Sequence, residues 1–190
     1  MEDLQVQYIK YIQSFFSFIP TNYLKYLDFL DSIWFYGLFL IFVKFYSRDK
    51  EKWQDLVILS LTSVFSNIFL KDLFSLPRPP KDVALIELSS SSFPSGAAQG
   101  AIIFYLMFFK NLQYRYQVIG LFLGGFMCLA RVILGVHYFS DLLGGLFVGF
   151  ALYFMYDNIP SKRSWLLVII TLLLALSGKA WTIWRTFYSL

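Results

Sequence analysis

The chain has 190 residues, of which 58% are hydrophobic, 21% aromatic and only 15% charged. This composition leaves too little polar surface to cover a water-soluble globule of that size, so it predicts a membrane protein. The formal net charge of +4 does not indicate nucleic-acid binding, because the basic residues are spread between apolar runs and form no patch or arm. Membrane lipids are the expected partners, and no nucleic-acid partner is expected.

The N-terminal segment has apolar residues at helical spacing without being apolar throughout. Within residues 4–26 the stripe consists of Leu4, Tyr8, Tyr11, Phe15 and Phe18, and Pro20 breaks the pattern. We interpret residues 1–28 as an amphipathic helix that lies at the membrane surface. The alternative is an extra membrane crossing of low hydrophobicity, which Lys10 and several polar residues disfavour.

Charged and turn residues divide the rest of the chain, residues 29–190, into apolar runs. A hydrocarbon core about 30 Å thick requires about 20 mostly apolar residues of helix. The six predicted crossings are residues 30–45, 56–74, 95–109, 116–134, 141–156 and 165–177. We therefore expect an all-α fold in which a bundle of about six transmembrane helices forms one domain.

The loops between these crossings alternate in charge. Basic residues are concentrated in segments 44–53, 110–115 and 157–163, which the positive-inside rule places in the cytoplasm. Segments 71–94 and 131–141 then lie on the opposite side, and they contain most of the remaining polar residues. We expect an integral protein of the bacterial inner membrane whose chemistry is on the periplasmic or extracellular side.

Two cations are placed at the end of the second predicted crossing. Lys71 and Arg78, in the sequence KDLFSLPRP, are seven residues apart, which on a helix is two turns along one face. Pro77 and Pro79 are expected to bend the chain so that Arg78 falls in the loop. Both cations could then converge on one anion.

The third predicted crossing begins in the sequence SSSSFPSGAAQG. Pro94 and Ser95 stand at its start, and Gly96 removes side-chain bulk from its first turn. Such a helix start offers free backbone N–H groups and the positive end of a dipole to an anion, and the Ser95 hydroxyl adds a donor. This pattern predicts a phosphate-binding site.

The sequence ARVILGVHYFSD contains Arg131, His137 and Asp141. The histidine and the aspartate are at i and i+4, so on a helix the carboxylate could hold one imidazole nitrogen and leave the other free to attack phosphorus. Cations and a helix start would stabilise the charge of an in-line phosphoryl transfer. One histidine and scattered carboxylates are too few ligands for a metal, so we expect no metal and no other cofactor.

Together these segments resemble the signature of the type-2 phosphatidic acid phosphatase family of membrane phosphatases and vanadium haloperoxidases. The signature reads K-x6-R-P, P-S-G-H and S-R-x5-H-x3-D, and residues 71–141 match its order and spacing, with Ala130 in place of the serine. The resemblance implies that His137 is the nucleophile and Asp141 its orienting partner. It also implies a phosphate-binding set consisting of Lys71, Arg78, Ser95, Gly96 and Arg131.

One position departs from this signature in a way that affects the chemistry. Ala97 stands where the family has the histidine of P-S-G-H, which is thought to protonate the leaving alkoxide, and His137 is the only histidine in the chain. Loss of a general acid costs a factor of about 100 to 10,000 in rate, so the chain as written is expected to be disabled or slow. The chain is either a degenerate family member or one in which a histidine was replaced, and the otherwise intact site favours replacement.

The leading hypothesis is a metal-independent phosphatase that hydrolyses a lipid phosphomonoester or pyrophosphate through a phosphohistidine. The family implies phosphatidic acid, phosphatidylglycerophosphate, isoprenyl pyrophosphate and lipid A 1-phosphate as candidate substrates. The alternatives are a catalytically inactive protein that binds lipid phosphates and a lipid phosphotransferase that uses the same intermediate. A channel or transporter is disfavoured, because the polar residues gather at one membrane face.

Overall fold

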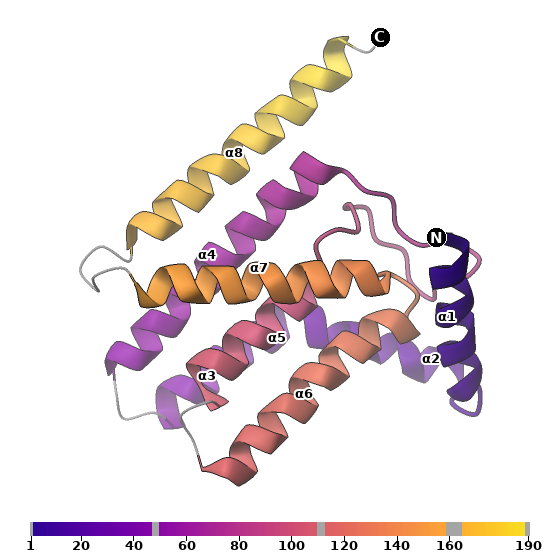
Figure 1. The fold of residues 1–190 in the computed structure, drawn as a ribbon, viewed down its shortest axis with the longest axis horizontal. Helices are drawn as coiled ribbons and strands as arrows, with labels where there is room; N and C mark the ends of the chain where they lie inside the picture. The colour runs from indigo at the N-terminus through magenta and orange to yellow at the C-terminus, as the bar shows by residue number, and fades with distance from the viewer. Residues whose placement is uncertain (1, 47–49, 110–112, 159–164, 189–190) are drawn as a thin grey trace.

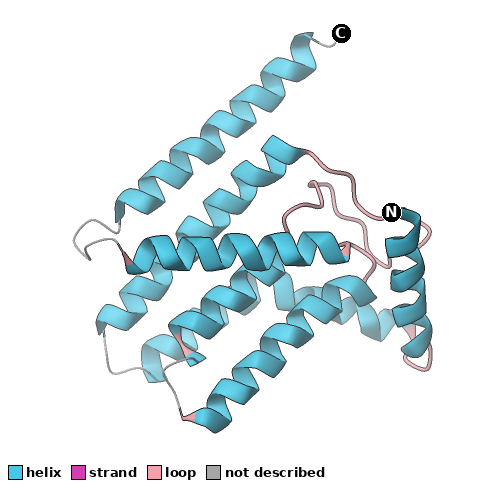
Figure 2. Ribbon diagram, in the orientation of Figure 1, coloured by secondary structure: helices cyan, strands magenta, loops and turns pink. Residues whose placement is uncertain are grey.

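The computed structural model describes residues 2–46, 50–109, 113–158 and 165–188, and all regular elements in these ranges are helical (Figure 2). The N-terminal part contains α1 (Glu2–Phe15), the single-turn α2 (Thr21–Leu24) and the 3-10 helix η1 (Lys25–Asp31). The bundle contains α3 (Ile33–Tyr46), α4 (Lys50–Phe74), α5 (Gly96–Met107), α6 (Tyr114–Ile133), α7 (Phe139–Asp157) and α8 (Trp165–Tyr188). The all-helical prediction is confirmed.

The helices differ in their ability to cross a membrane. Residues 53–74 of α4, together with α6 and α7, are long and apolar enough, and the bent pair Thr21–Asp31 and Trp34–Phe45, at 53°, could form one more span. Helix α5 has 12 residues, or about 18 Å of helix, and the described apolar part of α8 is also short. The prediction of six crossings therefore stays a prediction.

Helix α5 lies at the centre of the bundle and packs against α4, α6 and α7, while α8 packs along α4 (Figure 1). Small residues allow the close approach of α5 and α7. A Cβ atom added at Gly145 would lie 2.3 Å from the Ser95 carbonyl oxygen, and one at Gly149 would lie 2.3 Å from Ile102 Cγ2. These glycines bring the start of α5 against the start of α7.

The N-terminal helix α1 covers one end of the bundle, beside the loop that joins α4 to α5 (Figure 1). Its buried Ile9 packs with Val83 of that loop and with Val132 and Leu142 of α6 and α7. The predicted stripe of Leu4, Tyr8, Tyr11, Phe15 and Phe18 is exposed. An apolar stripe that faces away from the bundle fits contact with lipid, so the surface location remains our interpretation of α1.

The course of the N-terminal segment differs in detail from the prediction. Helix α1 ends at Phe15, before Pro20, and the chain then forms α2 and η1. Pro20 occupies the N-cap of α2, where a residue without an N–H group loses no helical hydrogen bond. The proline therefore marks the start of the next helix, and the first helix ends five residues earlier.

Candidate phosphate-binding and catalytic site

The C-terminal end of α6 and the N-terminal end of α7 lie beside α1 (Figure 1). The N-terminal end of α5 is joined to α7 by the hydrogen bond from the Ser95 N–H to the Asp141 carbonyl, and the C-terminal end of α4 is joined to the loop before α5 by hydrogen bonds from Lys71. Segments 71–94 and 131–141 therefore lie at one end, as the alternation of loop charge predicted. Several of the predicted cytoplasmic basic residues, including Arg48, Lys110 and Lys162, lie outside the described residues.

The candidate nucleophile lies in the connection between α6 and α7. His137 and Asp141 are buried, and Nδ1 of the imidazole is 3.4 Å from Oδ2 of the carboxylate. The same oxygen accepts a hydrogen bond from the Tyr138 backbone N–H at 2.8 Å and a short one from the Ser92 hydroxyl. Because Nδ1 faces the carboxylate, Nε2 is the nitrogen left for chemistry.

The reason for this proximity differs from the one predicted. His137 and Asp141 are not one turn apart on a helix, because α7 begins at Phe139 and Tyr138 is its N-cap. Asp141 lies in the first turn of α7, and its side chain folds back to the backbone of the N-cap residue. The carboxylate thus caps a helix and faces the histidine that precedes it.

The environment of His137 favours a neutral imidazole. Burial lowers the pKa of His137 below its ordinary value of 6.5, and the positive charges of Arg78, Lys71 and Arg131 lower it further, while the hydrogen bond with Asp141 opposes this shift. An unprotonated nitrogen is the form that can attack phosphorus. The three predicted cations therefore all act electrostatically on the histidine.

Lys71 and Arg78 meet at one carbonyl oxygen. Lys71 Nζ donates to the Ser91 carbonyl at 2.6 Å, and Arg78 Nη2 donates to the same oxygen at 3.3 Å. Arg78 also donates through Nη1 to the Val136 carbonyl at 2.7 Å, directly before His137. The structure therefore brings the predicted cations and the histidine together. The phosphate-binding role of the cations stays a prediction.

The start of α5 is hydrogen-bonded to the start of α7. Ser95 is the N-cap of α5, its hydroxyl accepts from the Ala98 N–H at 3.4 Å, and its own N–H donates to the Asp141 carbonyl at 3.0 Å. The first turn of a helix has no intrahelical acceptor for its N–H groups, so Gly96 and Ala97 keep donors for an anion. Ala97 is buried, and its methyl group has no acid–base function.

Arg131 has partners that the sequence pattern did not indicate. Its side chain is 2% exposed, and Nη1 donates to Asp28 Oδ1 at 2.8 Å, while Nη2 lies 3.5 Å from Asp31 Oδ2. The pKa of Arg78 is lowered by burial and then by the positive charge of Arg131. The side chain of Arg131 is thus bound to η1, and its role as a phosphate ligand stays a prediction.

Three further side chains of this region were missed by sequence reasoning. Ser92 was visible as one of the serines before Pro94, but nothing distinguished it from Ser89, Ser90 or Ser91. Asp28 and Asp31 are about one hundred residues from Arg131, and no motif marks them. Contacts across such a separation depend on how η1 packs against α6, which local spacing does not encode.

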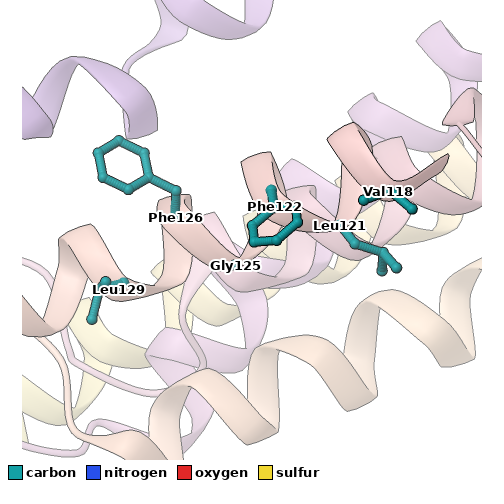
Figure 3. A pocket seen from close by; sticks show the side chains of 6 residues that line it. All are labelled: Val118, Leu121, Phe122, Gly125, Phe126 and Leu129. Carbon is teal, nitrogen blue, oxygen red and sulfur yellow. The ribbon is translucent and has the colours of Figure 1, made fainter. Parts of the chain in front are cut away.

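Neither a metal site nor the apolar hollow beside α6 coincides with this cluster. Within the described residues, no group of three or more His, Cys, Asp or Glu side chains is placed to hold a metal ion. A hollow of about 480 Å³ lies on the outer face of α6 (Figure 3) and is lined by Val118, Leu121, Phe122, Gly125, Phe126 and Leu129. Its lining is apolar, so we assign no phosphate chemistry to it.

The comparisons with known proteins agree with this geometry. The family model of the PAP2 superfamily matches residues 51–165. Phosphatidylglycerophosphatase B of Bacillus subtilis (strain 168) is 30% identical over 126 residues, which are 60% of this chain and 61% of that protein. The chain therefore aligns with less than two thirds of that relative.

Two solved structures share the fold. The transmembrane PAP2 type phosphatidylglycerolphosphate phosphatase from Bacillus subtilis matches with a TM-score of 0.61 and 22% identity over 78% of this chain and 82% of that one. LpxE from Aquifex aeolicus matches with a TM-score of 0.61 and 20% identity over 89% and 94%. Since the family model spans more than half of the chain and includes the His137 region, the chain is an integral membrane protein of the PAP2 superfamily.

Proposed function

We propose that this protein is a lipid phosphate phosphatase, with one phosphate site at the bundle end that α1 covers. The observation that carries the proposal is the convergence of Lys71 and Arg78 on one carbonyl beside the buried His137–Asp141 pair. Cations in such a position bind a phosphate group, and an imidazole oriented by a carboxylate supplies the nucleophile. Among the described residues of this cluster, no group of side chains is arranged to ligate a metal ion.

In the proposed reaction, Nε2 of His137 attacks phosphorus while the bond from phosphorus to the lipid oxygen breaks. Lys71, Arg78 and the N–H groups at the start of α5 stabilise the negative charge on the phosphoryl oxygens during this transfer. Asp141 keeps Nδ1 protonated and stabilises the imidazolium that develops. Water then hydrolyses the phosphohistidine and releases inorganic phosphate.

The leaving lipid alkoxide needs a proton, and Ala97 cannot provide one. Position 97 is in the first turn of α5, two residues after the N-cap Ser95, where a histidine side chain would be beside the phosphate site. The rate penalty of about 100 to 10,000 for a missing general acid applies to this step and leaves phosphate binding intact. We therefore expect the chain as written to bind its substrate and turn it over slowly.

We expect the substrate to be a lipid phosphate, because the site lies at one end of an apolar helix bundle. Phosphatidylglycerophosphate is the first candidate, because the Bacillus relative is named a phosphatidylglycerophosphatase. Phosphatidic acid, isoprenyl pyrophosphate and lipid A 1-phosphate are the other members of the class that we propose. The basic loop segments of the sequence, together with the described Lys44 at the end of α3 and Arg115 at the start of α6, support a periplasmic or extracellular site in a bacterial inner membrane.

A second function, binding of lipid phosphates without turnover, is favoured by one specific observation. Ala97 is buried in the first turn of α5 and supplies no proton for the leaving group. A protein of this kind would keep the cations and use the site for recognition alone. The two functions differ in whether histidine at position 97 restores hydrolysis.

The test is phosphate release from a panel of lipid phosphates in detergent. The chain as written is compared with Ala97→His and with the double variant Ala97→His, His137→Ala. We expect Ala97→His to raise the rate on one lipid by at least about 100-fold and the second change to abolish the gain. If Ala97→His releases no phosphate from any lipid, the phosphatase hypothesis is refuted and binding of lipid phosphates without turnover is favoured.

A further inference from the structure

The N-terminal segment supplies the side chains that hold Arg131. Asp28 and Asp31 both belong to η1 (Lys25–Asp31), which packs against α6. Asp28 binds Nη1 of the arginine, Asp31 binds Nη2, and the other oxygen of Asp31 accepts a hydrogen bond from the Tyr36 hydroxyl at 3.1 Å. Both carboxylates lie outside residues 51–165, the part that the family model matches.

The two carboxylates bind the terminal nitrogens of Arg131 but not its Nε. A guanidinium group has five N–H donors in a fixed plane, and the two carboxylates engage the two terminal nitrogens. Nε is buried and has no hydrogen-bond partner among the described residues. A buried donor without an acceptor is costly, and an oxygen of a bound phosphate would satisfy it.

The geometry also explains why two carboxylates are present. A guanidinium that is 2% exposed requires a counter-charge, and one carboxylate would provide it. Contacts at both terminal nitrogens additionally fix the rotation of the guanidinium plane. The edge formed by Nε and a remaining N–H then keeps one direction, as bidentate binding of a phosphate requires.

We propose that Asp28 and Asp31 are positioning residues that hold Arg131 with its Nε edge free for the phosphate group of the substrate. This inference rests on the proposed function and on the phosphate-binding role that the family resemblance implies for Arg131. The N-terminal segment would then complete the phosphate site, although it lies outside the matched family region. The opposite arrangement, in which the carboxylates compete with phosphate for Arg131, predicts the opposite change in affinity.

The experiment measures binding of inorganic phosphate to the full chain in detergent by titration calorimetry. The chain as written is suitable, because inorganic phosphate is the product and is not turned over. We expect Asp28→Ala, Asp31→Ala to raise the Kd at least about tenfold, and Asp28→Asn, Asp31→Asn, which keeps acceptor oxygens, to raise it less. Glu87→Gln, a carboxylate change in the exposed loop that joins α4 to α5, is the matched control and should leave the Kd unchanged.

A double-mutant cycle separates positioning from a structural role. In an Arg131→Met background, the aspartate changes should have no further effect on the Kd, because the residue they orient is gone. Phosphate affinity that is unchanged or increased in both aspartate double variants would overturn the inference. If the double alanine chain does not fold, the asparagine pair and Asp31→Ala alone provide the same comparison, with about a threefold rise expected for each.

The same titrations distinguish failure of this inference from failure of the proposed function. If the chain as written binds phosphate and Arg131→Met weakens that binding, the role of Arg131 stands and the aspartate variants test positioning alone. If the chain as written does not bind phosphate and Ala97→His releases none from lipids, the proposed function is wrong, and the inference is overturned with it.

Discussion

The matched family region and the N-terminal segment contribute to the same end of the molecule by different means. Residues 71–141 provide the cations and the histidine, and their spacing is a motif. Residues 2–31 have no motif, yet α1 and η1 reach this end through Ile9, Gln13 and the ion pairs with Arg131. A sequence signature can therefore identify a site without identifying the elements that hold it in place.

The largest expected effect comes from the matched region. The guanidinium group of Arg78 donates to the carbonyl oxygens of Ser90, Ser91 and Val136. A lysine at this position keeps the positive charge, but its single ammonium group cannot reach all three acceptors as the planar guanidinium does. In the Ala97→His background, we expect Arg78→Lys to lower kcat/KM about 100-fold, comparable to loss of one donor that stabilises the transition state.

The measurement is phosphate release from the lipid that responds best to Ala97→His. Arg115→Lys is the matched control, because Arg115 is exposed at the start of α6, where its guanidinium stacks on Tyr116 at the opposite end of the helix from Arg131. Equal activities of the two lysine variants would show that Arg78 acts only as a point charge.

The next effect tests how firmly the N-terminal segment is attached. The Gln13 amide donates to the Val83 carbonyl at 2.8 Å and to the Ile133 carbonyl at 2.9 Å, and so it joins α1 to the loop and to α6. Gln13→Ala leaves both carbonyls without this donor, and we expect a loss of about 2 kcal/mol in the free energy of unfolding. Denaturation in detergent measures it, with Gln7→Ala on the exposed face of α1 as control. A loss in both variants would indicate an effect of helix composition instead.

The sequence allowed much of the bundle to be predicted, because hydropathy and charged boundaries are local properties. The predicted crossing at residues 116–134 agrees with α6 to within two residues at each end, and the crossing at 141–156 does so with α7. The N-terminal part was less predictable, since α2 and η1 take their positions from contacts with α6. The site residues at positions 71, 78, 137 and 141 were predicted because their chemistry and spacing occur together.

The remaining parts of the site could not be found from spacing. Ser92 is one of four consecutive serines, and only the fold turns its hydroxyl toward Asp141. The proximity of His137 to Asp141 was predicted for the wrong reason, because a helix was assumed where the chain forms a loop and an N-cap. A local pattern can therefore predict which residues meet while giving the wrong backbone between them.

Ser92 provides a smaller, more specific test of the matched region. Its buried hydroxyl donates to Asp141 Oδ2 and lies 3.5 Å from His137 Nδ1, so we expect it to orient the pair. In the Ala97→His background, we expect Ser92→Ala to lower kcat about tenfold, corresponding to about 1.4 kcal/mol, with little change in KM. Ser89→Ala, in the exposed part of the same serine run, is the control. A change confined to KM would contradict a role in orienting the histidine.

The smallest effect concerns the pH dependence of stability, and it follows from the single histidine of the chain. Burial lowers the pKa of His137 in the folded state below 6.5, so on acidification the unfolded state takes up the proton first. Stability is therefore unaffected by this group above about pH 7 and falls as the pH decreases below 6.5, by at most about 1.4 kcal/mol per pH unit.

Thermal unfolding in detergent at pH 7.5 and pH 5.5 measures this change in the chain as written and in His137→Gln. We expect a difference of about 1 kcal/mol between the two chains in the response to pH, or about 2 to 4 °C in Tm for a chain of this size. The titrating side chains that do not contact His137 are common to both proteins, so their contributions cancel in this difference. Identical responses would mean that the folded protein accepts a proton on His137 as readily as the unfolded chain does, and this result would contradict the lowered pKa of the buried imidazole.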